Sequence, residues 1–407
     1  MNITVNKSIA RGEVKAPPSK SMAHRCLICA ALAEGVSVLS GVAFSQDILA
    51  TLDCIRALGA KVSIEGDMVT ITGATALNKR EDAEFSCRES GSTLRFFLPL
   101  AMLSPQPAVF YGSGRLLERP LGIYEDLCRK QEISFKRDQG QIRIQGTLNP
   151  GTYPVPGNIS SQFITGLLFA LPLLNEDSEI EIEPPVESLS YIRMTVAAMR
   201  SFGIKVLWEQ PQRLVIPGNQ QYQSRNMQVE GDYSNAAFLE AFNIIGGEVK
   251  VTGLSEDTLQ GDSVYRVLFP KLQKEEQTID LSDCPDLGPI LFVVAALCHG
   301  GRFTGTERLA IKESDRGRVM CEELKKVGVE SVYRENEIVI KESGLFPPKV
   351  PLKGHNDHRI VMALTVLLSA VGGRIEGAEA VDKSYPDFFK DIQKLGIEVQ
   401  EDGTVSW

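Results

Sequence analysis

The stretch LGAKVSIEGDMVTITG (residues 58–73) alternates apolar and polar residues on both sides of a turn, a pattern that is typical of a β-hairpin. Similar stretches recur along the chain, most of them about 70 residues apart. The other copies are KQEISFKRDQGQIRIQG (130–146), FGIKVLWEQPQRLVIPG (202–218), VGVESVYRENEIVIKES (327–343), LGIEVQEDGTVSW (395–407) and a weaker copy, LQKEEQTIDLSD (272–283). This regular recurrence predicts six repeated units.

Each hairpin is preceded by a second recurring piece, a polar start followed by an almost wholly apolar helix. The clearest example is NDHRIVMALTVLLSAVGG (356–373). Helices that are apolar on nearly every face are buried rather than laid on a surface. We therefore expect an α/β fold in which sheets and amphipathic helices wrap buried helices. The expected starts of these helices are Ser19, Ser90, Ser160, Asp286 and Asp357, with the sixth helix in GDYSNAAFLEAFNIIGG (231–247).

Two segments have the composition of connections between domains: EVKAPPSK (13–20) and NMQVEGDYS (226–234). They predict a discontinuous domain, 1–14 with 229–407, and an inserted domain, 15–228. Each domain then holds three repeats, and the strand-like N-terminal segment 2–14 is left over. If the units are alike, their helix starts point the same way, so we expect both domains to direct helix dipoles into one cleft between them.

The composition of the 407-residue chain is that of a globular protein, with 43% hydrophobic and 23% charged residues. Its net charge of −9 argues against a binder of nucleic acid or anionic membranes. The N-terminus has no apolar run of the secretory type, and apolar stretches such as 360–371 are shorter than the roughly 20 residues of a membrane span. The eight cysteines are scattered, with one CxxC at Cys26 and Cys29 inside an apolar helix pattern. We expect a cytoplasmic protein with reduced thiols.

Cations gather at the starts of the predicted helices, where the backbone dipole already favours negative charge. In PSKSMAHR (18–25), Lys20 and Arg25 stand in the first turns of such a helix. Placed together without a ligand these cations would repel, so their grouping predicts a polyanionic ligand or two small anionic substrates. The cations concerned are Lys20, Arg25, Arg119, Lys312, Arg316, Arg359 and Lys383.

Two carboxylates accompany the cations: Asp286 in CPDLG (284–288) and Glu313 in KESDR (312–316). A carboxylate beside cations is a base at neutral pH, and a buried carboxyl that keeps its proton is an acid. Such a pair suits group transfer between phosphorylated metabolites. Taken singly, each feature has a plainer interpretation: Glu313 as a helix-start acid, Ser161 and Ser314 as N-caps, and Gly91-Ser92 as a turn.

We expect no metal and no nucleotide cofactor. His355, Asp357 and His358 have the residue types of metal ligands, but Arg359 follows directly and would repel a divalent ion. The sequence contains neither a GxGxxG fingerprint nor a P-loop lysine motif.

Seven short motifs occur in the order found in the EPSP synthase (3-phosphoshikimate 1-carboxyvinyltransferase) family, and the chain resembles this family from residue 15 to residue 390. The motifs are PSKSMAHR, ESGSTLR, ERP, SSQF, KESDR, NDHR and DKSYPDFF. The resemblance implies a fold of two inside-out α/β domains of three repeats each. It also implies transfer of the enolpyruvyl group of phosphoenolpyruvate to the 5-hydroxyl of shikimate 3-phosphate, with release of phosphate.

Matching motifs imply the roles of individual residues. Asp286 would accept the proton of the attacking hydroxyl, while Glu313, with Lys20, would protonate the methylene carbon of phosphoenolpyruvate. The residues implied for shikimate 3-phosphate are Lys20, Ser21, Arg25, Ser160, Ser161, Gln162, Ser188, Tyr191, Asp286 and Lys312. Those implied for phosphoenolpyruvate are Lys20, Gly91, Arg119, Gln162, Arg316, Arg359 and Lys383.

Three residues differ from those that relatives often carry: His24 and Glu89, where relatives have Asn, and Arg308, where some relatives use an Asn. Two other functions remain open at this point. The sister enolpyruvyl transferase acting on UDP-N-acetylglucosamine shares the repeats, and a non-catalytic phosphate-binding scaffold would share the cations. We expect a monomer whose partners are the two small substrates.

Overall fold

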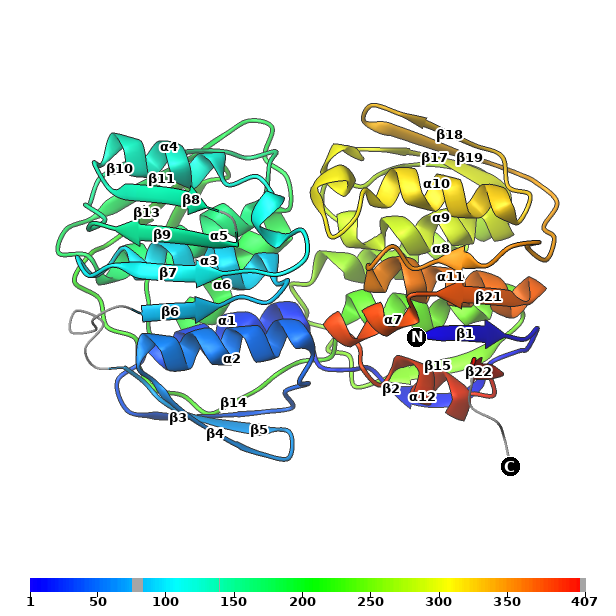
Figure 1. The fold of residues 1–407 in the computed structure, drawn as a ribbon, viewed down its shortest axis with the longest axis horizontal. Helices are drawn as coiled ribbons and strands as arrows, with labels where there is room; N and C mark the ends of the chain where they lie inside the picture. Colours follow the sequence, from blue (N-terminus) through cyan, green and yellow to red (C-terminus); the bar gives the residue numbers. More distant parts are fainter. Residues whose placement is uncertain (75–82, 139, 403–407) are drawn as a thin grey trace. The chain divides into compact units, whose positions relative to one another are not determined.

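The computed structural model describes residues 1–74, 83–138 and 140–402. The chain folds into two compact units, one made of Met1–Pro17 with Gly231–Trp407 and the other of Pro18–Glu230 (Figure 1). Each unit has its own hydrophobic core, built mainly from three buried helices.

Three four-stranded sheets surround the core of unit Pro18–Glu230. Each sheet follows one pattern: a parallel pair of strands, then a hairpin that adds antiparallel to the second strand. In the first sheet the strand order is β14 (Met227–Gln228), β3 (Val36–Ser40), β5 (Met68–Thr72) and β4 (Lys61–Glu65). In the second it is β6 (Ala83–Ser86), β7 (Ala108–Tyr111), β9 (Gln141–Gln145) and β8 (Ser134–Asp138). In the third it is β10 (Thr152–Pro156), β11 (Ser178–Glu183), β13 (Arg213–Ile216) and β12 (Leu207–Gln210).

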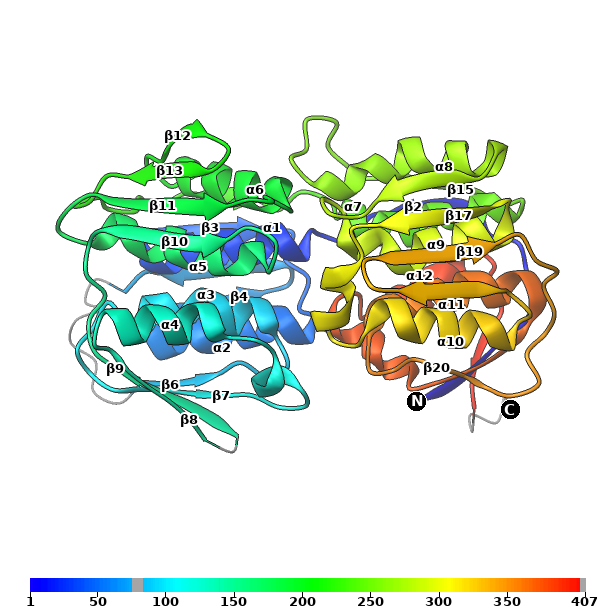
Figure 2. The same ribbon diagram turned by 90° about the horizontal axis from the view of Figure 1, so that it is seen from above.

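The helices of this unit are of two kinds. The buried ones are α1 (Lys20–Leu32), α3 (Gly91–Ala101) and α5 (Ser161–Ala170); the partly exposed ones are α2 (Gln46–Leu58), α4 (Gly122–Lys130) and α6 (Leu189–Ser201). In α1 every residue from Ala23 to Leu32 is buried. In Figure 2, α3 and α5 lie between strands β10 and β11 on one side and β6 and β7 on the other, so the helices are inside and the sheets outside.

Unit Met1–Pro17 with Gly231–Trp407 repeats this plan with one reduced sheet. One four-stranded sheet has the strand order β20 (Leu352–Lys353), β21 (Gly373–Glu376), β1 (Asn2–Val5) and β22 (Val399–Glu401). The other has the order β16 (Gln277–Asp280), β17 (Gly300–Thr304), β19 (Glu337–Lys341) and β18 (Ser331–Arg334). The reduced sheet is the pair β15 (Glu248–Thr252) and β2 (Arg11–Lys15). The buried helices are α7 (Tyr233–Glu240), α9 (Gly288–Leu297) and α11 (His358–Val371), and the outer ones are α8 (Tyr265–Lys274), α10 (Arg316–Lys326) and α12 (Phe388–Lys394). The predicted inside-out α/β class with repeated units is therefore confirmed.

Three details of the sequence prediction need correction or limitation. Segment 272–283 is not a hairpin: it contains the end of α8 and the single strand β16, which pairs in parallel with β17. The N-terminal strand is not left over, because β1 pairs antiparallel with both β21 and β22 and thereby takes the place of a hairpin strand. In the last expected hairpin only β22 is described, since residues 403–407 lie outside the described part of the chain.

Polar caps begin the buried helices, as the sequence predicts. The hydroxyls of Ser19, Ser90 and Ser160 accept the backbone N–H groups of Met22, Thr93 and Gln162, while Asp232 and Asp357 cap α7 and α11 in the same way. The exception is α9, which starts at Gly288 because Asp286 lies in the preceding 3₁₀ turn Pro285–Leu287.

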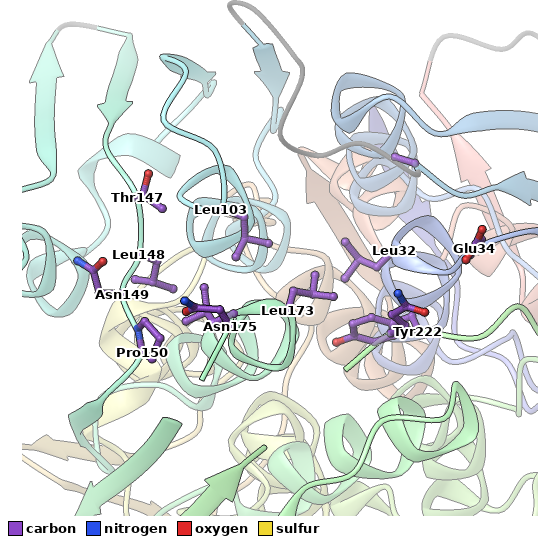
Figure 3. A pocket seen from close by; sticks show the side chains of 13 residues that line it. Leu32, Glu34, Leu103, Thr147, Leu148, Asn149, Pro150, Leu173, Asn175 and Tyr222 are labelled. Carbon is purple, nitrogen blue, oxygen red and sulfur yellow. The ribbon is translucent and has the colours of Figure 1, made fainter. Parts of the chain in front are cut away.

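A cavity of about 570 Å³ opens where the buried helices of unit Pro18–Glu230 end (Figure 3). Leu32, Leu103 and Leu173 line it from the ends of the helical segments, together with Asn149 and Tyr222. None of its described lining residues is among those predicted to be functional. Four of the predicted residues, Lys20, Gly91, Ser160 and Ser161, lie at the opposite, N-terminal ends of α1, α3 and α5. In the described part of the chain, no helix combines the length and the apolar character needed to cross a membrane.

Candidate active site

Side-chain contacts join the starts of four helices in unit Pro18–Glu230 in two pairs, α1 with α2 and α5 with α3. Lys20 in the first turn of α1 forms an ion pair of 2.7 Å with Asp47 at the start of α2. At the start of α5, Gln162 Nε2 donates to Ser92 Oγ in the first turn of α3 at 2.9 Å. Because unpaired N–H groups and the positive dipole end gather at each helix start, this end of the unit is suited to anions.

Arg25 is a buried cation held entirely by neutral oxygens. Its side chain donates to Ser21 O at 2.6 Å, Thr195 Oγ1 at 2.9 Å and Tyr191 O at 3.0 Å, and only 3% of the residue is exposed. It forms no ion pair within the described ranges, and burial lowers its pKa to about 10 despite the opposing effect of Tyr191. A buried charge without a counter-ion is costly, so Arg25 is best explained as one half of a contact with an anionic ligand.

Gly91, Arg119 and Gln162 meet around the start of α3. A Cβ atom added at Gly91 would lie only 2.5 Å from Nη1 of Arg119, so the guanidinium sits directly on the backbone of Gly91. Gln162 is fixed from its other side as well, because its Oε1 accepts Nη1 of Arg95 at 2.6 Å. The arrangement presents one guanidinium and one helix start together, a combination that binds phosphate or carboxylate groups.

The remaining predicted residues of this unit lie at the starts of α5 and α6. Ser160 caps α5, Ser161 is its first residue, and both are buried. Ser188 precedes α6 and is held in the left-handed region at φ 54°. The ring of Tyr191, in the first turn of α6, lies 5.9 Å from the guanidinium carbon of Arg25. These contacts bring the α6 start to Arg25.

In the other unit, three cations surround the Asp286 carboxylate. Oδ1 lies 2.8 Å from Arg316 Nη1 and 3.3 Å from Lys312 Nζ, and Oδ2 lies 3.0 Å from Arg359 Nη2. Neighbouring cations favour the charged form of a carboxylate. Asp286 therefore has the electrostatic surroundings of a base that is ionised at neutral pH.

Arg316 ties Asp286 to two further carboxylates. Its Nη2 lies 2.6 Å from Glu313 Oε2 and its Nε lies 2.8 Å from Asp357 Oδ2, while only 2% of its side chain is exposed. Burial alone would lower the pKa of Arg316, but Asp357, Glu313 and Asp286 outweigh it and raise this pKa above its usual value. The planar guanidinium thus fixes Glu313 and Asp286 relative to one another.

Lys312 and Lys383 extend this cluster. Burial lowers the pKa of Lys312 to about 8, against the opposing effect of Asp286. Lys383 is buried, and its Nζ donates to the backbone carbonyl of Asn356 at 2.7 Å, directly before the start of α11. Unit Gly231–Trp407 therefore brings together all six residues that the sequence assigned to it: Asp286, Lys312, Glu313, Arg316, Arg359 and Lys383.

The histidines considered as metal ligands have other contacts. His355 Nε2 lies 2.8 Å from Glu323 Oε1, and His358 is buried in the first turn of α11. Among the described residues, no group of three or more His, Cys, Asp or Glu side chains is placed to hold a metal ion.

Comparison with known proteins gives the family. The sequence model described as EPSP synthase (3-phosphoshikimate 1-carboxyvinyltransferase) matches residues 6–392. The chain belongs to the EPSP synthase family. Among its relatives, the 3-phosphoshikimate 1-carboxyvinyltransferase of Clostridium kluyveri is 39% identical over 98% of both chains, and that of Clostridium perfringens is 39% identical over 97% of this chain and 98% of its own.

Solved structures share the fold of this EPSP synthase family member. The EPSP synthase from Acinetobacter baumannii aligns with a TM-score of 0.76 at 23% identity and covers 98% of this chain and 100% of its own. The enolpyruvyl transferase NikO from Streptomyces tendae aligns with the same TM-score at 14% identity, over 98% of both chains. At these identities the likeness concerns the fold.

From the sequence of this family member, Asp47 and Arg95 were not singled out, and the ion pair that Asp357 forms was not predicted. Asp47 lies 27 residues from its partner Lys20, Arg95 lies 67 residues from Gln162, and Asp357 lies 41 residues from Arg316. Arg95 stands inside the motif ESGSTLR, so its charge in an otherwise apolar helix was the available signal. Asp357 stands in the motif NDHR and was predicted as a helix start, but its ion pair with Arg316 had no local signal. Asp47 had no local signal at all, because its role depends on a contact between distant segments.

Proposed function

We propose that the chain transfers the enolpyruvyl group of phosphoenolpyruvate to the 5-hydroxyl of shikimate 3-phosphate, giving 5-enolpyruvylshikimate 3-phosphate and phosphate. Membership of the EPSP synthase family and the names of the curated relatives support this activity. The observation in the molecule that carries it is the Asp286 carboxylate, surrounded by Lys312, Arg316 and Arg359 and joined through Arg316 to Glu313. A binding scaffold needs the cations but has no use for the paired carboxylates.

The proposed substrate contacts follow the two clusters. Arg25, with its unmatched buried charge, binds the phosphate of shikimate 3-phosphate, and Lys312 adds a second cation. Arg119, Arg316 and Arg359 bind the phosphate and carboxylate of phosphoenolpyruvate. Because these residues come from both units, the proposal requires both units to act on one pair of substrates. The remaining contacts assigned to shikimate 3-phosphate are Lys20, Ser21, Ser160, Ser161, Gln162, Ser188 and Tyr191, and those assigned to phosphoenolpyruvate are Lys20, Gly91, Gln162 and Lys383.

The proposed reaction is an addition followed by an elimination. Asp286 takes the proton of the 5-hydroxyl as its oxygen bonds to C2 of phosphoenolpyruvate, while Glu313, with Lys20, delivers a proton to the C3 methylene. Glu313, now ionised, then takes a proton from C3 of the tetrahedral adduct as the C–O bond to phosphate breaks, and Asp286 gives the proton that it took to the departing phosphate. The double bond is restored and inorganic phosphate leaves, so that atoms and charge balance without an oxidant or a metal.

The proposal also includes a monomeric enzyme in the cytoplasm, with no nucleic-acid partner. The supporting observation for the compartment is that all eight cysteines are free thiols, and six of them are buried. Free thiols in such number are usual in reducing compartments.

The test is phosphate release from phosphoenolpyruvate by the purified protein with no acceptor, with shikimate 3-phosphate, or with UDP-N-acetylglucosamine. Release that depends on shikimate 3-phosphate is the expected result. Release only with the nucleotide sugar would assign the chain to the sister reaction, and no release with either acceptor would leave a phosphate-binding scaffold. In Asp286→Asn, turnover is expected to fall on the order of a thousandfold while calorimetry still detects shikimate 3-phosphate. Full turnover in this variant would show that Asp286 is not the base.

A further inference from the structure

A chain of buried polar side chains links three helices of unit Pro18–Glu230. His24 Nδ1 in α1 lies 2.7 Å from Thr51 Oγ1 in α2. Thr51 Oγ1 lies 2.8 Å from Thr93 Oγ1 in α3, which donates to Ser90 Oγ at 2.8 Å. The same Ser90 hydroxyl accepts the backbone N–H of Thr93 and so caps α3. The chain therefore ends on the residue that begins α3.

All four residues are inaccessible to water: His24 and Ser90 are 1% exposed, and Thr51 and Thr93 are 0% exposed. Burial lowers the pKa of His24 well below its usual value, and the nearby charges of Lys20 and Arg25 lower it further. The ring is thus neutral, with one N–H donor and one acceptor nitrogen. Hydrogen bonds in such a low-dielectric interior are stronger than in water, and a missing partner there is costly.

One assignment of hydrogens gives both threonine hydroxyls along the chain a donor and an acceptor. With the proton on Nδ1, His24 donates to Thr51, Thr51 donates to Thr93, and Thr93 donates to Ser90. The other ring nitrogen, Nε2, makes no hydrogen bond within the described ranges. His24 therefore contributes to this network through Nδ1.

The far end of the chain lies beside residues assigned above to phosphoenolpyruvate. Ser90 is followed by Gly91, on which Arg119 rests, and by Ser92, whose hydroxyl accepts Gln162 Nε2. We propose that His24 is a positioning residue that holds the first turn of α3 in place through Thr51 and Thr93, and thereby sets the affinity of the site for phosphoenolpyruvate rather than for shikimate 3-phosphate. This inference rests on the proposed function and assigns a role to a residue outside the substrate contacts.

A second pair of buried threonines supplies the matched control. Thr165 Oγ1 in α5 lies 2.9 Å from Thr195 Oγ1 in α6, and Thr195 Oγ1 accepts Arg25 Nε at 2.9 Å. Thr165 and Thr195 are both 0% exposed, as Thr51 and Thr93 are. This pair ends on a residue assigned to shikimate 3-phosphate, so an equivalent substitution here should affect the other substrate.

The test compares the steady-state kinetics of His24→Leu, His24→Asn, Thr51→Val and Thr165→Val. The side-chain amide of Asn places a polar atom where Nδ1 stands, so His24→Asn keeps the hydrogen bond to Thr51 that His24→Leu loses. We expect His24→Leu and Thr51→Val to raise the KM for phosphoenolpyruvate about fivefold with no change in the KM for shikimate 3-phosphate. His24→Asn should match the unsubstituted protein, and Thr165→Val should raise the KM for shikimate 3-phosphate instead.

Hydrogen exchange of peptides spanning residues 88–95 provides a readout that does not depend on turnover. The amides of the first turn of α3 should exchange faster in His24→Leu and Thr51→Val, and at the unsubstituted rate in His24→Asn. Equal rises in both KM values, or unchanged KM and exchange in Thr51→Val, would overturn the positioning role. Thr51→Val breaks the same chain if His24→Leu does not fold. If the unsubstituted protein shows no turnover, the proposed function is overturned instead. The hydrogen exchange of residues 88–95 in the variants then tests the positioning role without the kinetics.

Discussion

We predict that Lys312 makes the binding of shikimate 3-phosphate dependent on pH. Its Nζ lies 3.3 Å from Asp286 Oδ1, and 23% of its side chain is exposed. Burial lowers the pKa of this lysine to about 8; Asp286 opposes the shift, and Arg308 and Arg316 add to it. The free protein therefore loses the Lys312 charge within a pH range that is easy to measure, whereas an ordinary lysine titrates near 10.4.

The size of the effect follows from proton linkage. A phosphate monoester is already a dianion above about pH 6, so Lys312 is the member of the pair that titrates between about pH 7 and 9. If only the charged lysine binds, the apparent Kd scales as one plus the ratio of neutral to charged lysine. With a pKa of about 8, the Kd at pH 9 is about ten times that at pH 7, or about 1.4 kcal/mol of binding free energy. Affinity is retained below this pKa and lost as the pH rises through it.

Isothermal titration calorimetry with shikimate 3-phosphate, without phosphoenolpyruvate, measures this dependence across the range. Lys312→Arg is the control, because a guanidinium keeps its charge throughout. We expect a rising Kd in the unsubstituted protein and a nearly constant Kd in Lys312→Arg. A constant Kd in the unsubstituted protein, or an equal slope in both proteins, would refute the assignment of this titration to Lys312.

Three further predictions concern other contacts. In Gly91→Ala the new Cβ would stand 2.5 Å from Arg119 Nη1, so the guanidinium must move; the KM for phosphoenolpyruvate should rise on the order of tenfold in steady-state kinetics, and an unchanged KM would contradict the close contact. Arg316→Met leaves the buried Asp357 carboxylate without its paired guanidinium and should lower the free energy of unfolding in urea by about 3–5 kcal/mol; a loss below about 1 kcal/mol would argue against this network. Burial and the nearby Asp286 raise the pKa of Asp262 to about 6, so the folded protein binds more protons than the unfolded chain, and stability is lost as the pH rises through about 6. Relative to Asp262→Asn, the unsubstituted protein should lose up to about 3 kcal/mol between about pH 4 and 6, and parallel stability curves for the two proteins would disprove this.

The parts of the fold that depend on local pattern could be predicted from the sequence. Almost wholly apolar segments such as 360–371 identify buried helices, and the serines before them identify the caps. The prediction of a hairpin at 272–283 was wrong because a few alternating residues fit a single strand as well as a hairpin. Only the parallel pairing of β16 with β17 decides between the two. Likewise, the position of β1 depends on partners at the far end of the chain, which no local pattern reports.

Part of the candidate site could likewise be predicted from the sequence, and part could not. The cations could be found from the sequence, because several charges at helix starts are unusual in a chain with a net charge of −9. The partners of each cation could not be predicted from the sequence: Lys20 is paired with Asp47, whereas Arg25 has only neutral partners among the described residues. Likewise, the sequence marked His24 as a departure from relatives, but its contact with Thr51 depends on the packing of α1 against α2. Such differences arise from tertiary contacts.

The pairing of β1 with β21 and β22 has a consequence for synthesis on the ribosome. Residues 2–5 are made before unit Pro18–Glu230, whereas their partners at 373–376 and 399–401 are made after it. Unit Pro18–Glu230 is complete about 140 residues before the first of these partners is translated, an interval of roughly 7–30 s at ordinary elongation rates. During that interval the first strand has no partner strand, and the two units acquire their structure in the order inner segment first, chain ends last. This strand pairing of the nascent protein thus joins residues made before unit Pro18–Glu230 to residues made after it.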